Sequence, residues 1–356
     1  MKKKVLFLYS ELADYTVNCI NLLAEKAEIK LVHWPINPEA PFEFKFSHNI
    51  KALSRNLFTI QELSKFLSDS KPDLVLVSGW IDKGYLKAIN NQPGIKKRVL
   101  MMDTAWDGTL KQKIGLLGLK SVIRGLFSHA FVSGKSQALY AQKLGIAPSK
   151  IHQGYYSADV DYFNEIFRQK SSNSHFSTPN SQLSTILYLG RYVKHKGIFE
   201  LWEAFTEIIT ENQNLKHWEL ICAGTGDQWE NRIQHPNIKH LGFLQPQEME
   251  PVLLETSIYI LPSHFEPWGV SVHEMAAAGF PLLLSEEVGS KEAFLEERLN
   301  GFSFPAKNKQ ALKASLLKMM QLPESELQKM GKHSNKLAQK ITPQKWVETI
   351  QSILKD

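Results

Sequence analysis

Residues 257–284, SIYILPSHFEPWGVSVHEMAAAGFPLLL, decide the fold of the second half of the chain. The stretch begins and ends with short apolar runs, SIYILP and LLL, that have the composition of buried strands. Between them a helix-forming run, 270–278, begins after Gly269. It ends at Gly279, and Pro281 cannot continue it. This order of strand, loop, helix and strand predicts one unit of a parallel α/β sheet.

The loop before that helix has the features of a phosphate site. Ligands of open α/β sheets bind beyond the carboxyl ends of the strands, where the next helix presents unpaired N–H groups. We therefore expect an anion at Gly269, Val270 and Ser271. Glu266 and Glu274 flank this place, and because a carboxylate repels phosphate, we expect both to accept hydrogen bonds from hydroxyl groups. A sugar nucleotide carries hydroxyls on either side of its diphosphate.

The same residues resemble a known family. EPWG at 266–269, followed by EMAAAGFP at 274–281, resembles the Glu-x7-Glu signature of the retaining family-4 glycosyltransferases. The alternative is an ordinary strand-helix unit with two surface glutamates. Either glutamate alone would favour this alternative, but the whole motif argues against it. The resemblance implies an α/β protein of the GT-B fold, with two Rossmann-like domains facing each other across a deep cleft. It also implies a retaining, metal-independent hexosyltransferase.

The chain is long enough for two domains. Of its 356 residues, 43% are hydrophobic, which is sufficient for two cores of ordinary size. We place an N-terminal Rossmann-like acceptor domain at 1–168 and a Ser- and Asn-rich linker at 169–182. The nucleotide-sugar donor domain follows at 183–342. From the family's fold, we expect the C-terminal helix, 343–356, to join the first domain.

Charge and cysteine content indicate the setting. The 42 Lys and Arg residues exceed the 36 Asp and Glu residues by six, which favours phosphorylated ligands or an anionic membrane surface and does not indicate nucleic acid. Cys19 and Cys222 lie far apart, so neither a disulfide framework nor a metal cluster is predicted, and we expect a cytoplasmic protein. The opening MKKKVLFLYSE has too short an apolar run for a signal peptide and is interpreted as the first strand. No stretch is long and apolar enough to span a bilayer.

A second ligand loop is predicted near residue 190. The apolar run TILYL is followed by Gly190 and Arg191, and Lys196 ends the same loop. A glycine at a strand end permits close approach, and the Arg fork and the Lys ammonium can share the negative charge of a leaving diphosphate. These residues resemble the family's diphosphate-binding pair. A basic surface loop is the alternative, and it is disfavoured because both loops follow the carboxyl ends of strands.

The resemblance assigns two further loops to the donor. Gly224 and Gly226 follow the predicted strand 219–223 and lie near the base or phosphate, although a GxG pattern alone is a weak signal. Phe243 lies in the loop expected to contact the base. The short match DVD at 159–161 does not carry a metal site, so we expect no metal and no cofactor besides the donor.

The first domain offers one candidate on the acceptor side. Asp103 directly follows the predicted strand 98–102, at the edge of the sheet where ligands bind. It is predicted to be a general base or a ligand of the acceptor hydroxyl, and a loop-capping role is equally open. The opening strand is not followed by GxGxxG, which argues against a dehydrogenase.

The segment 110–127 is predicted to be a helix with two kinds of face. Its apolar residues recur at helical spacing and its cations share another side: Leu116, Leu119, Ile123 and Leu126, and Lys113, Lys120 and Arg124. The favoured interpretation is packing against the sheet with a solvated positive side. The other is a basic amphipathic helix on anionic lipid, which would place the protein on the inner face of the cytoplasmic membrane.

Together these residues predict transfer of a sugar from a nucleotide diphosphate sugar, with UDP favoured, to a saccharide or lipid-linked acceptor. Such a reaction serves polysaccharide, lipopolysaccharide or glycolipid biosynthesis. Arg191, Lys196 and the N-terminus of helix 270–278 would stabilise the departing diphosphate. Glu274 would hold the ribose and Glu266 the donor sugar. The alternatives are a sugar-nucleotide epimerase of the same fold and a non-catalytic nucleotide-sugar binding protein.

Overall fold

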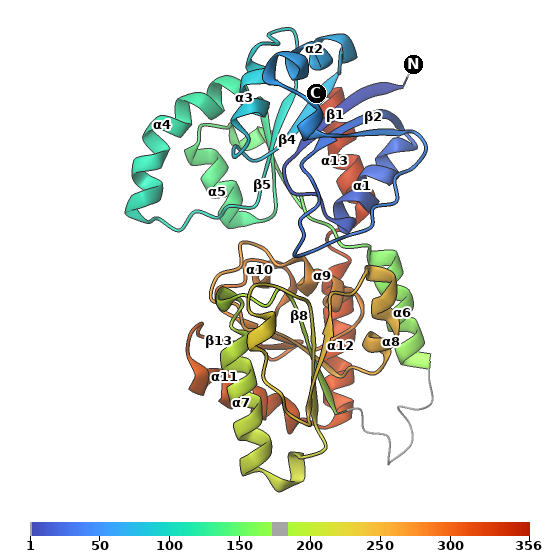
Figure 1. Ribbon diagram of the computed structural model, residues 1–356, viewed down its shortest axis with the longest axis vertical. Helices are drawn as coiled ribbons and strands as arrows, with labels where there is room; N and C mark the ends of the chain where they lie inside the picture. Colours follow the sequence, from blue (N-terminus) through green and yellow to red (C-terminus); the bar gives the residue numbers. More distant parts are fainter. Residues whose placement is uncertain (1, 173–183) are drawn as a thin grey trace. The chain divides into compact units, whose positions relative to one another are not determined.

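The computed structural model describes residues 2–172 and 184–356, and these form two compact units (Figure 1). The first unit contains 1–37, 42–157 and 341–356, and the second contains 38–41 and 158–340. The chain therefore leaves the first unit after Ser157, before the predicted boundary at 168, and returns to it at Ile341. The predicted linker, 169–182, begins inside a helix of the second unit, and its part from 173 onward lies outside the described residues.

The first unit is a parallel sheet between two layers of helices. Its strands have the order β3-β2-β1-β4-β5-β6-β7. The strands are β1 (Lys3–Tyr9), β2 (Ala27–His33), β3 (Ile50–Ser54), β4 (Leu74–Ser78), β5 (Arg98–Met102), β6 (His129–Val132) and β7 (Ile151–Gln153). The helices are α1 (Asp14–Ala24), α2 (Ile60–Ser70), α3 (Lys83–Asn90), α4 (Leu110–Leu126), α5 (Lys135–Lys143) and α13 (Pro343–Lys355).

Strand side chains alternate between two cores on opposite faces of this sheet, as the pleat requires. Phe7 and Met101 pack with α1 and α13, whereas Leu8 and Met102 pack with helices α2 to α5. Because both faces are covered, the strands read as continuous apolar runs in the sequence.

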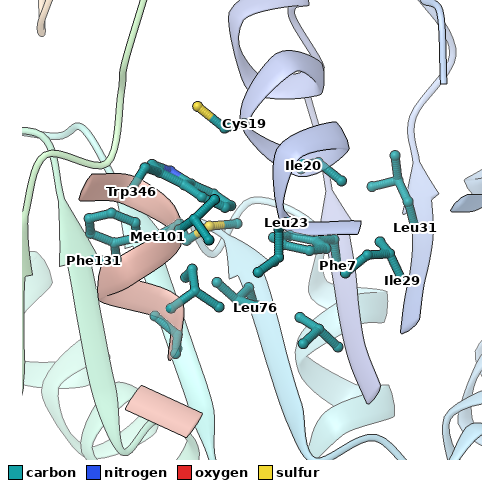
Figure 2. Close-up of a cluster of buried hydrophobic side chains, with 14 of the residues drawn as sticks. Phe7, Cys19, Ile20, Leu23, Ile29, Leu31, Leu76, Met101, Phe131 and Trp346 are labelled. Atoms are coloured by element: carbon teal, nitrogen blue, oxygen red, sulfur yellow. The ribbon is translucent and has the colours of Figure 1, made fainter. Parts of the chain in front are cut away.

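The C-terminal helix α13 contributes the largest side chain of the first core (Figure 2). The Trp346 ring lies 6.1 Å from the Phe7 ring and 5.9 Å from the Phe131 ring, centroid to centroid. Its indole N–H donates to the Tyr155 carbonyl at 2.9 Å. A helix far along the chain therefore completes the core that begins with β1.

The second unit repeats this architecture. Its sheet has the order β10-β9-β8-β11-β12-β13, and every recorded pairing is parallel. The strands are β8 (Thr185–Leu189), β9 (Glu219–Ala223), β10 (Ile238–Gly242), β11 (Ile258–Leu261), β12 (Leu282–Ser285) and β13 (Gly301–Phe304). The helices are α6 (Val160–Ser172), α7 (Ile198–Glu211), α8 (Met249–Leu254), α9 (Val270–Ala277), α10 (Lys291–Phe294), α11 (Lys309–Met320) and α12 (Glu324–Ala338). The predicted α/β class with two Rossmann-like domains is confirmed.

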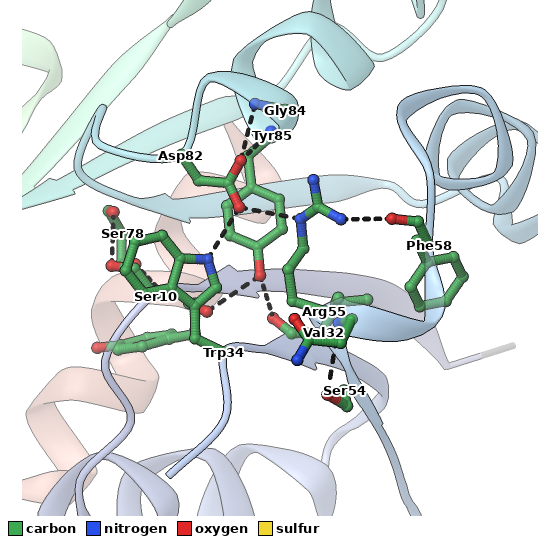
Figure 3. A network of polar contacts seen from close by, with 12 residues as sticks. Ser10, Val32, Trp34, Ser54, Arg55, Phe58, Ser78, Asp82, Gly84 and Tyr85 are labelled. Carbon is green, nitrogen blue, oxygen red and sulfur yellow. Dashed lines mark hydrogen bonds and ion pairs between the residues drawn. The ribbon is translucent and has the colours of Figure 1, made fainter. Parts of the chain in front are cut away.

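A polar network at the carboxyl ends of β2 and β4 centres on Asp82 (Figure 3). The carboxylate accepts from Trp34 Nε1 and Arg55 Nε, each at 2.9 Å. It also caps α3 by accepting from the Gly84 and Tyr85 N–H groups. Burial favours the protonated carboxyl, but the hydrogen bonds from Trp34, Tyr85 and Arg55 outweigh it and hold the pKa of Asp82 below its usual value.

The same network joins the ends of three strands. The Tyr85 hydroxyl donates to the Tyr9 and Val32 carbonyls, which belong to β1 and β2. The Ser10 N–H donates to Ser78 Oγ at 2.7 Å, which links the ends of β1 and β4. Hydrogen bonds therefore connect the loops at the switch point of this sheet, between β1 and β4.

Among the helices that the structure describes, none combines the length and the apolar composition needed to cross a lipid bilayer.

Replacing Asp82 with alanine should lower the free energy of unfolding by about 3 kcal/mol at pH 7, because a helix cap and a buried ion pair are lost together. The folded-state pKa is depressed, so this contribution is present above the unfolded pKa, near pH 4, and is lost as pH falls through the folded pKa. Urea unfolding at pH 7 and pH 3 should therefore show a smaller difference between wild type and variant at pH 3. Asp69→Ala, on the exposed face of α2, is the matched control. An equal difference at both pH values would contradict the assignment.

Candidate functional site

The candidate site lies where the second sheet changes direction. From β8 the chain adds β9 and β10 on one side, and from β11 it adds β12 and β13 on the other. Ligands of open α/β sheets bind beyond the carboxyl ends of the strands at such a switch point. The loops after the two central strands are 190–197 and 262–269. These loops contain five of the residues predicted to bind the donor: Gly190, Arg191, Lys196, Glu266 and Gly269.

The two loops touch backbone to backbone. Gly197 has φ of +68°, and a Cβ there would lie 2.1 Å from the Pro262 carbonyl oxygen, so only glycine fits. The His264 N–H donates to the His195 carbonyl at 2.7 Å. Main-chain contacts therefore hold the two loops against each other.

A buried ion pair joins the same loops. Lys196 Nζ binds Glu266 Oε2, and the two side chains are only 14% and 12% exposed. The structure thus brings together two residues that the sequence predicted to serve different parts of the donor. Separating the two charges would leave each of them largely buried without a partner, which is unfavourable, so the pair holds both side chains in place.

The loop after β12 supports the Glu266 segment from its other side. The Glu266 N–H donates to the Glu287 carbonyl at 3.2 Å, and the Gly289 N–H returns a bond to the Glu266 carbonyl at 2.9 Å. Ser290 Oγ donates to the Gly269 carbonyl at 3.1 Å. The backbone carrying Glu266 is therefore fixed between neighbouring segments before any ligand binds.

Helix α9 begins at the predicted phosphate site. Gly269, with φ of +88°, precedes Val270 at the first helical position. Glu274 lies three residues beyond Ser271, so the two side chains share a face of the helix. In this arrangement the first N–H groups of α9 can donate hydrogen bonds to an anion, and the Glu274 carboxylate lies about one turn further along the helix.

Tyr259 is a buried residue of β11 that contacts helix α9, although the sequence predicted it only as a strand residue. Its hydroxyl donates to Ser271 Oγ at 2.7 Å. Burial raises the pKa of Tyr259, and the negative charges of Glu266 and Glu274 raise it further. An aromatic residue with a hydroxyl, two positions before the end of a strand that leads to the site, is the signal that could have identified it.

The predicted glycines lie in tight contacts at the ends of β8 and β9. A Cβ on Gly224 would lie 2.0 Å from the Gly190 carbonyl oxygen, and a Cβ on Gly226 would lie 2.6 Å from the Tyr192 carbonyl oxygen. The Tyr192 N–H donates to the Thr225 carbonyl at 2.8 Å. These glycines let two loops approach closely.

Arg191 extends from the loop after β8 with 40% of its side chain exposed. Its Nη1 donates to Glu39 Oε2 at 3.0 Å, within the second unit, to which 38–41 belong. The guanidinium therefore already holds an anionic group. Next to it, burial lowers the pKa of His195, and the positive charges of Lys196 and Arg191 lower it further, which favours a neutral imidazole at pH 7.

Two predicted site residues belong to other segments of the chain. Phe243 is half-buried and directly follows β10, at the edge of the sheet. Asp103 belongs to the first unit, where its Oδ2 accepts from the Tyr156 hydroxyl at 3.2 Å and its carbonyl from Gln137 Nε2 at 3.1 Å.

Within residues 2–172 and 184–356, no three His, Cys, Asp or Glu side chains gather as metal ligands. In the DVD segment, Asp159 Oδ1 accepts from the Tyr162 N–H at the start of α6. Independence from metal stays a prediction. What the site offers chemically is two cations, a helix N-terminus and two carboxylates around one switch point.

Comparison with solved structures shows the fold. The sucrose-phosphate synthase of Thermosynechococcus elongatus aligns with a TM-score of 0.74 at 13% identity, over 99% of this chain and 98% of that one. Anabaena HepE, solved with UDP and glucose, aligns with a TM-score of 0.72 at 12% identity, over 100% of both chains. These are GT-B proteins, with two parallel-sheet Rossmann-like units.

Sequence comparison reaches only part of the chain. An uncharacterized glycosyltransferase of Methanocaldococcus jannaschii is 31% identical over 130 residues, which are 35% of this chain and 32% of that protein. The 2-deoxystreptamine N-acetyl-D-glucosaminyltransferase of Niallia circulans is 29% identical over 118 residues, which are 31% and 29%. The match thus spans about a third of the length of these curated relatives.

One protein family matches the second unit directly. Residues 169–337 match the family described as Glycosyl transferases group 1. That segment contains both loops of the switch point, the Lys196–Glu266 pair and helix α9. A chain with the two-domain GT-B fold therefore carries, over residues 169–337, a glycosyl transferases group 1 domain.

Proposed function

We propose that this chain is a retaining, metal-independent glycosyltransferase that uses a nucleotide diphosphate sugar. The second unit is the proposed donor domain and the first the proposed acceptor domain. One observation carries the proposal: the cations Arg191 and Lys196 and the N-terminus of α9 follow the two central strands, β8 and β11, at the switch point of one sheet. Together they suit a diphosphate, which carries negative charge on both phosphates.

Stabilisation of the leaving diphosphate is the main catalytic task in this proposal. As the bond from the anomeric carbon to the diphosphate oxygen breaks, negative charge grows on that oxygen and positive charge on the sugar ring. Fixed donors aimed at the growing charge lower this barrier most effectively. Arg191, Lys196 and the N–H groups at Gly269, Val270 and Ser271 are the proposed donors, with Gly190, Gly224 and Gly226 allowing close approach.

The carboxylates are assigned to hydroxyl groups. Glu274 holds the ribose, and Glu266 holds the donor sugar. The pairing of Glu266 with Lys196 is compatible with this, because the ion pair uses one carboxylate oxygen and a carboxylate has about four lone-pair sites. Phe243 is the proposed contact of the base.

Retention follows from attack on the same face as the leaving group. The acceptor oxygen forms the new bond to the anomeric carbon, and its proton passes to the departing diphosphate. Asp103 is the candidate ligand of the acceptor hydroxyl, since it follows a strand end of the first unit and its carboxylate already accepts one hydroxyl, that of Tyr156. The alternative is that Asp103 acts as the general base and takes this proton in place of the diphosphate.

Uracil is the donor base that we propose first. Anabaena HepE, which shares the fold, was solved with UDP and glucose. The acceptor is a saccharide or a lipid-linked saccharide in polysaccharide, lipopolysaccharide or glycolipid biosynthesis. The two cysteines are buried free thiols, in keeping with a cytoplasmic protein.

Thermal melting in the presence of UDP, GDP, ADP, CMP or NAD tests the donor site. A ligand at 100 times its dissociation constant adds about 2.7 kcal/mol of stability, which raises the melting temperature of a domain of this size by several degrees. We expect one nucleoside diphosphate, UDP first, to raise the midpoint of the wild type. Glu274→Ala should lose that shift because the ribose contact is gone.

Glu255→Ala, which removes an exposed glutamate just after α8, is the matched control and should keep the shift. A response to NAD alone, or to none of the five compounds, would overturn the proposal. A shift that Glu274→Ala retains would remove Glu274 from the site.

Replacing Lys196 tests the chemistry. Lys196→Ala should lower turnover of the donor by at least about a hundredfold, because one preorganised donor to the leaving group is worth roughly that much or more. Release of the nucleoside diphosphate on mixing donor with acceptor is the measurement. Lys194→Ala, an exposed lysine in the same turn, should retain wild-type turnover.

Stability is the confounding effect in this test. Alone, Lys196→Ala leaves Glu266 buried without its partner, which costs about 3 kcal/mol. The double variant Lys196→Ala, Glu266→Gln removes the charge and should recover part of that stability without recovering turnover. Wild-type turnover in Lys196→Ala would exclude Lys196 from the mechanism.

A further inference from the structure

Helix α4 of the first unit has two apolar faces, of which only one is packed. Ile123 and Leu126 are buried in the core, with Leu116 and Leu119 partly buried beside them, as the sequence predicted. On the opposite side, a second stripe points outward: Leu110, Ile114 and Leu117 are 72%, 61% and 82% exposed. Packing against the sheet therefore explains only half of the apolar residues of this helix.

A row of cations flanks the exposed stripe. At 100° per residue, Lys113, Lys120 and Arg124 fall along one border of the line through Leu110, Ile114 and Leu117. All three cations are exposed, and none takes part in an ion pair within the described residues. The segment 110–126 contains no Asp or Glu, so no charge on the helix itself offsets them.

Three glycines leave positions on the outer surface of α4 without side chains. The helix contains Gly115, Gly118 and Gly125, and a Cβ at each would meet no atom within 4 Å. Glycine disfavours a helix in water, and here no neighbouring atom requires it. Beside Gly125, the side chains of Leu117, Lys120 and Arg124 line a shallow hollow with Ser121. A broad surface can approach the backbone closely along this side.

We propose that the outward face of α4 docks on the surface of an anionic lipid bilayer. The stripe Leu110, Ile114 and Leu117 inserts between the headgroups, and Lys113, Lys120 and Arg124 bind lipid phosphates. Interfacial helices have this division between an apolar face and flanking cations. At 17 residues, α4 lies along the membrane for about 25 Å.

Charge favours a bilayer over a second copy of the chain. A symmetric pair would bring two rows of the same three cations toward each other, whereas an anionic surface neutralises them. This inference goes beyond the proposed function and does not rest on it, because it concerns only the first unit and its test does not measure activity. It would place the enzyme where a lipid-linked acceptor is found.

Vesicle binding compares two triple variants of equal charge. The first replaces Lys113, Lys120 and Arg124 with glutamine. The control replaces Lys26, Lys45 and Lys51 with glutamine, which are exposed lysines of the same unit in and around β2 and β3. Binding is measured by co-sedimentation at low salt with vesicles of phosphatidylglycerol and phosphatidylcholine, and with phosphatidylcholine alone.

We expect the wild type to bind the anionic vesicles and to dissociate at high salt. Each cation near an anionic surface contributes about a fivefold factor, so the α4 variant should bind roughly a hundredfold more weakly. The control should stay within about threefold of the wild type. Equal loss in both variants, or no binding by the wild type, would overturn the proposal.

A fluorescent probe locates the contact. Cys19 and Cys222 are buried, so a cysteine introduced by Leu117→Cys can be labelled selectively with an environment-sensitive dye. The dye should shift to the blue on anionic vesicles, and a dye on Lys51→Cys should not. A shift at both positions or at neither would overturn the placement. If the α4 variant instead abolished self-association of the wild type in light scattering without vesicles, the occupant would be a second copy and the proposal would fail.

Discussion

The buried pair of Lys196 and Glu266 is the interaction on which the arrangement of the second unit's loops depends. Strands β8 and β11 are neighbours in register, so the loops that follow them must begin side by side. Gly197 brings one backbone against the Pro262 carbonyl, and the ion pair then fixes the two side chains that carry opposite charge. Helix α9 begins where the second of these loops ends, so its N-terminus follows directly from this arrangement.

The sequence predicted the strands, loops and helix of this region because their signals are local. Strand ends, Gly269, Gly279 and the glycines after β8 and β9 each require a particular backbone, and the order of elements then places them on one sheet edge. Tyr259 was missed because a tyrosine within an apolar strand looks like a core residue, and only the fold reveals that its hydroxyl reaches Ser271. The pairing of Lys196 with Glu266 was missed for a related reason: no spacing in the sequence reports which long side chains meet.

The first unit was harder to predict. Strand β3 (Ile50–Ser54) lies at the sheet edge with partly exposed residues, so the run IKALS lacks the apolar pattern of a central strand. Helix α6 was assigned in part to the first domain and in part to the linker, although Phe163 and Ile166 bury a helical stripe in the second unit. For α4 the inward apolar stripe was predicted correctly. The outward stripe was overlooked because apolar residues recur at helical spacing on both faces of this helix, and the spacing does not show which face is exposed.

Helix α13 has a consequence for how the protein is made. Phe7 and Phe131 lie in a core that also contains Trp346, so this core is complete only after α13 has been synthesised. The second unit, 158–340, is contiguous apart from one short segment and leaves the ribosome before α13 does. The first unit is thus completed after the second, and until α13 arrives the apolar side chains that it covers stay open to water and to aggregation.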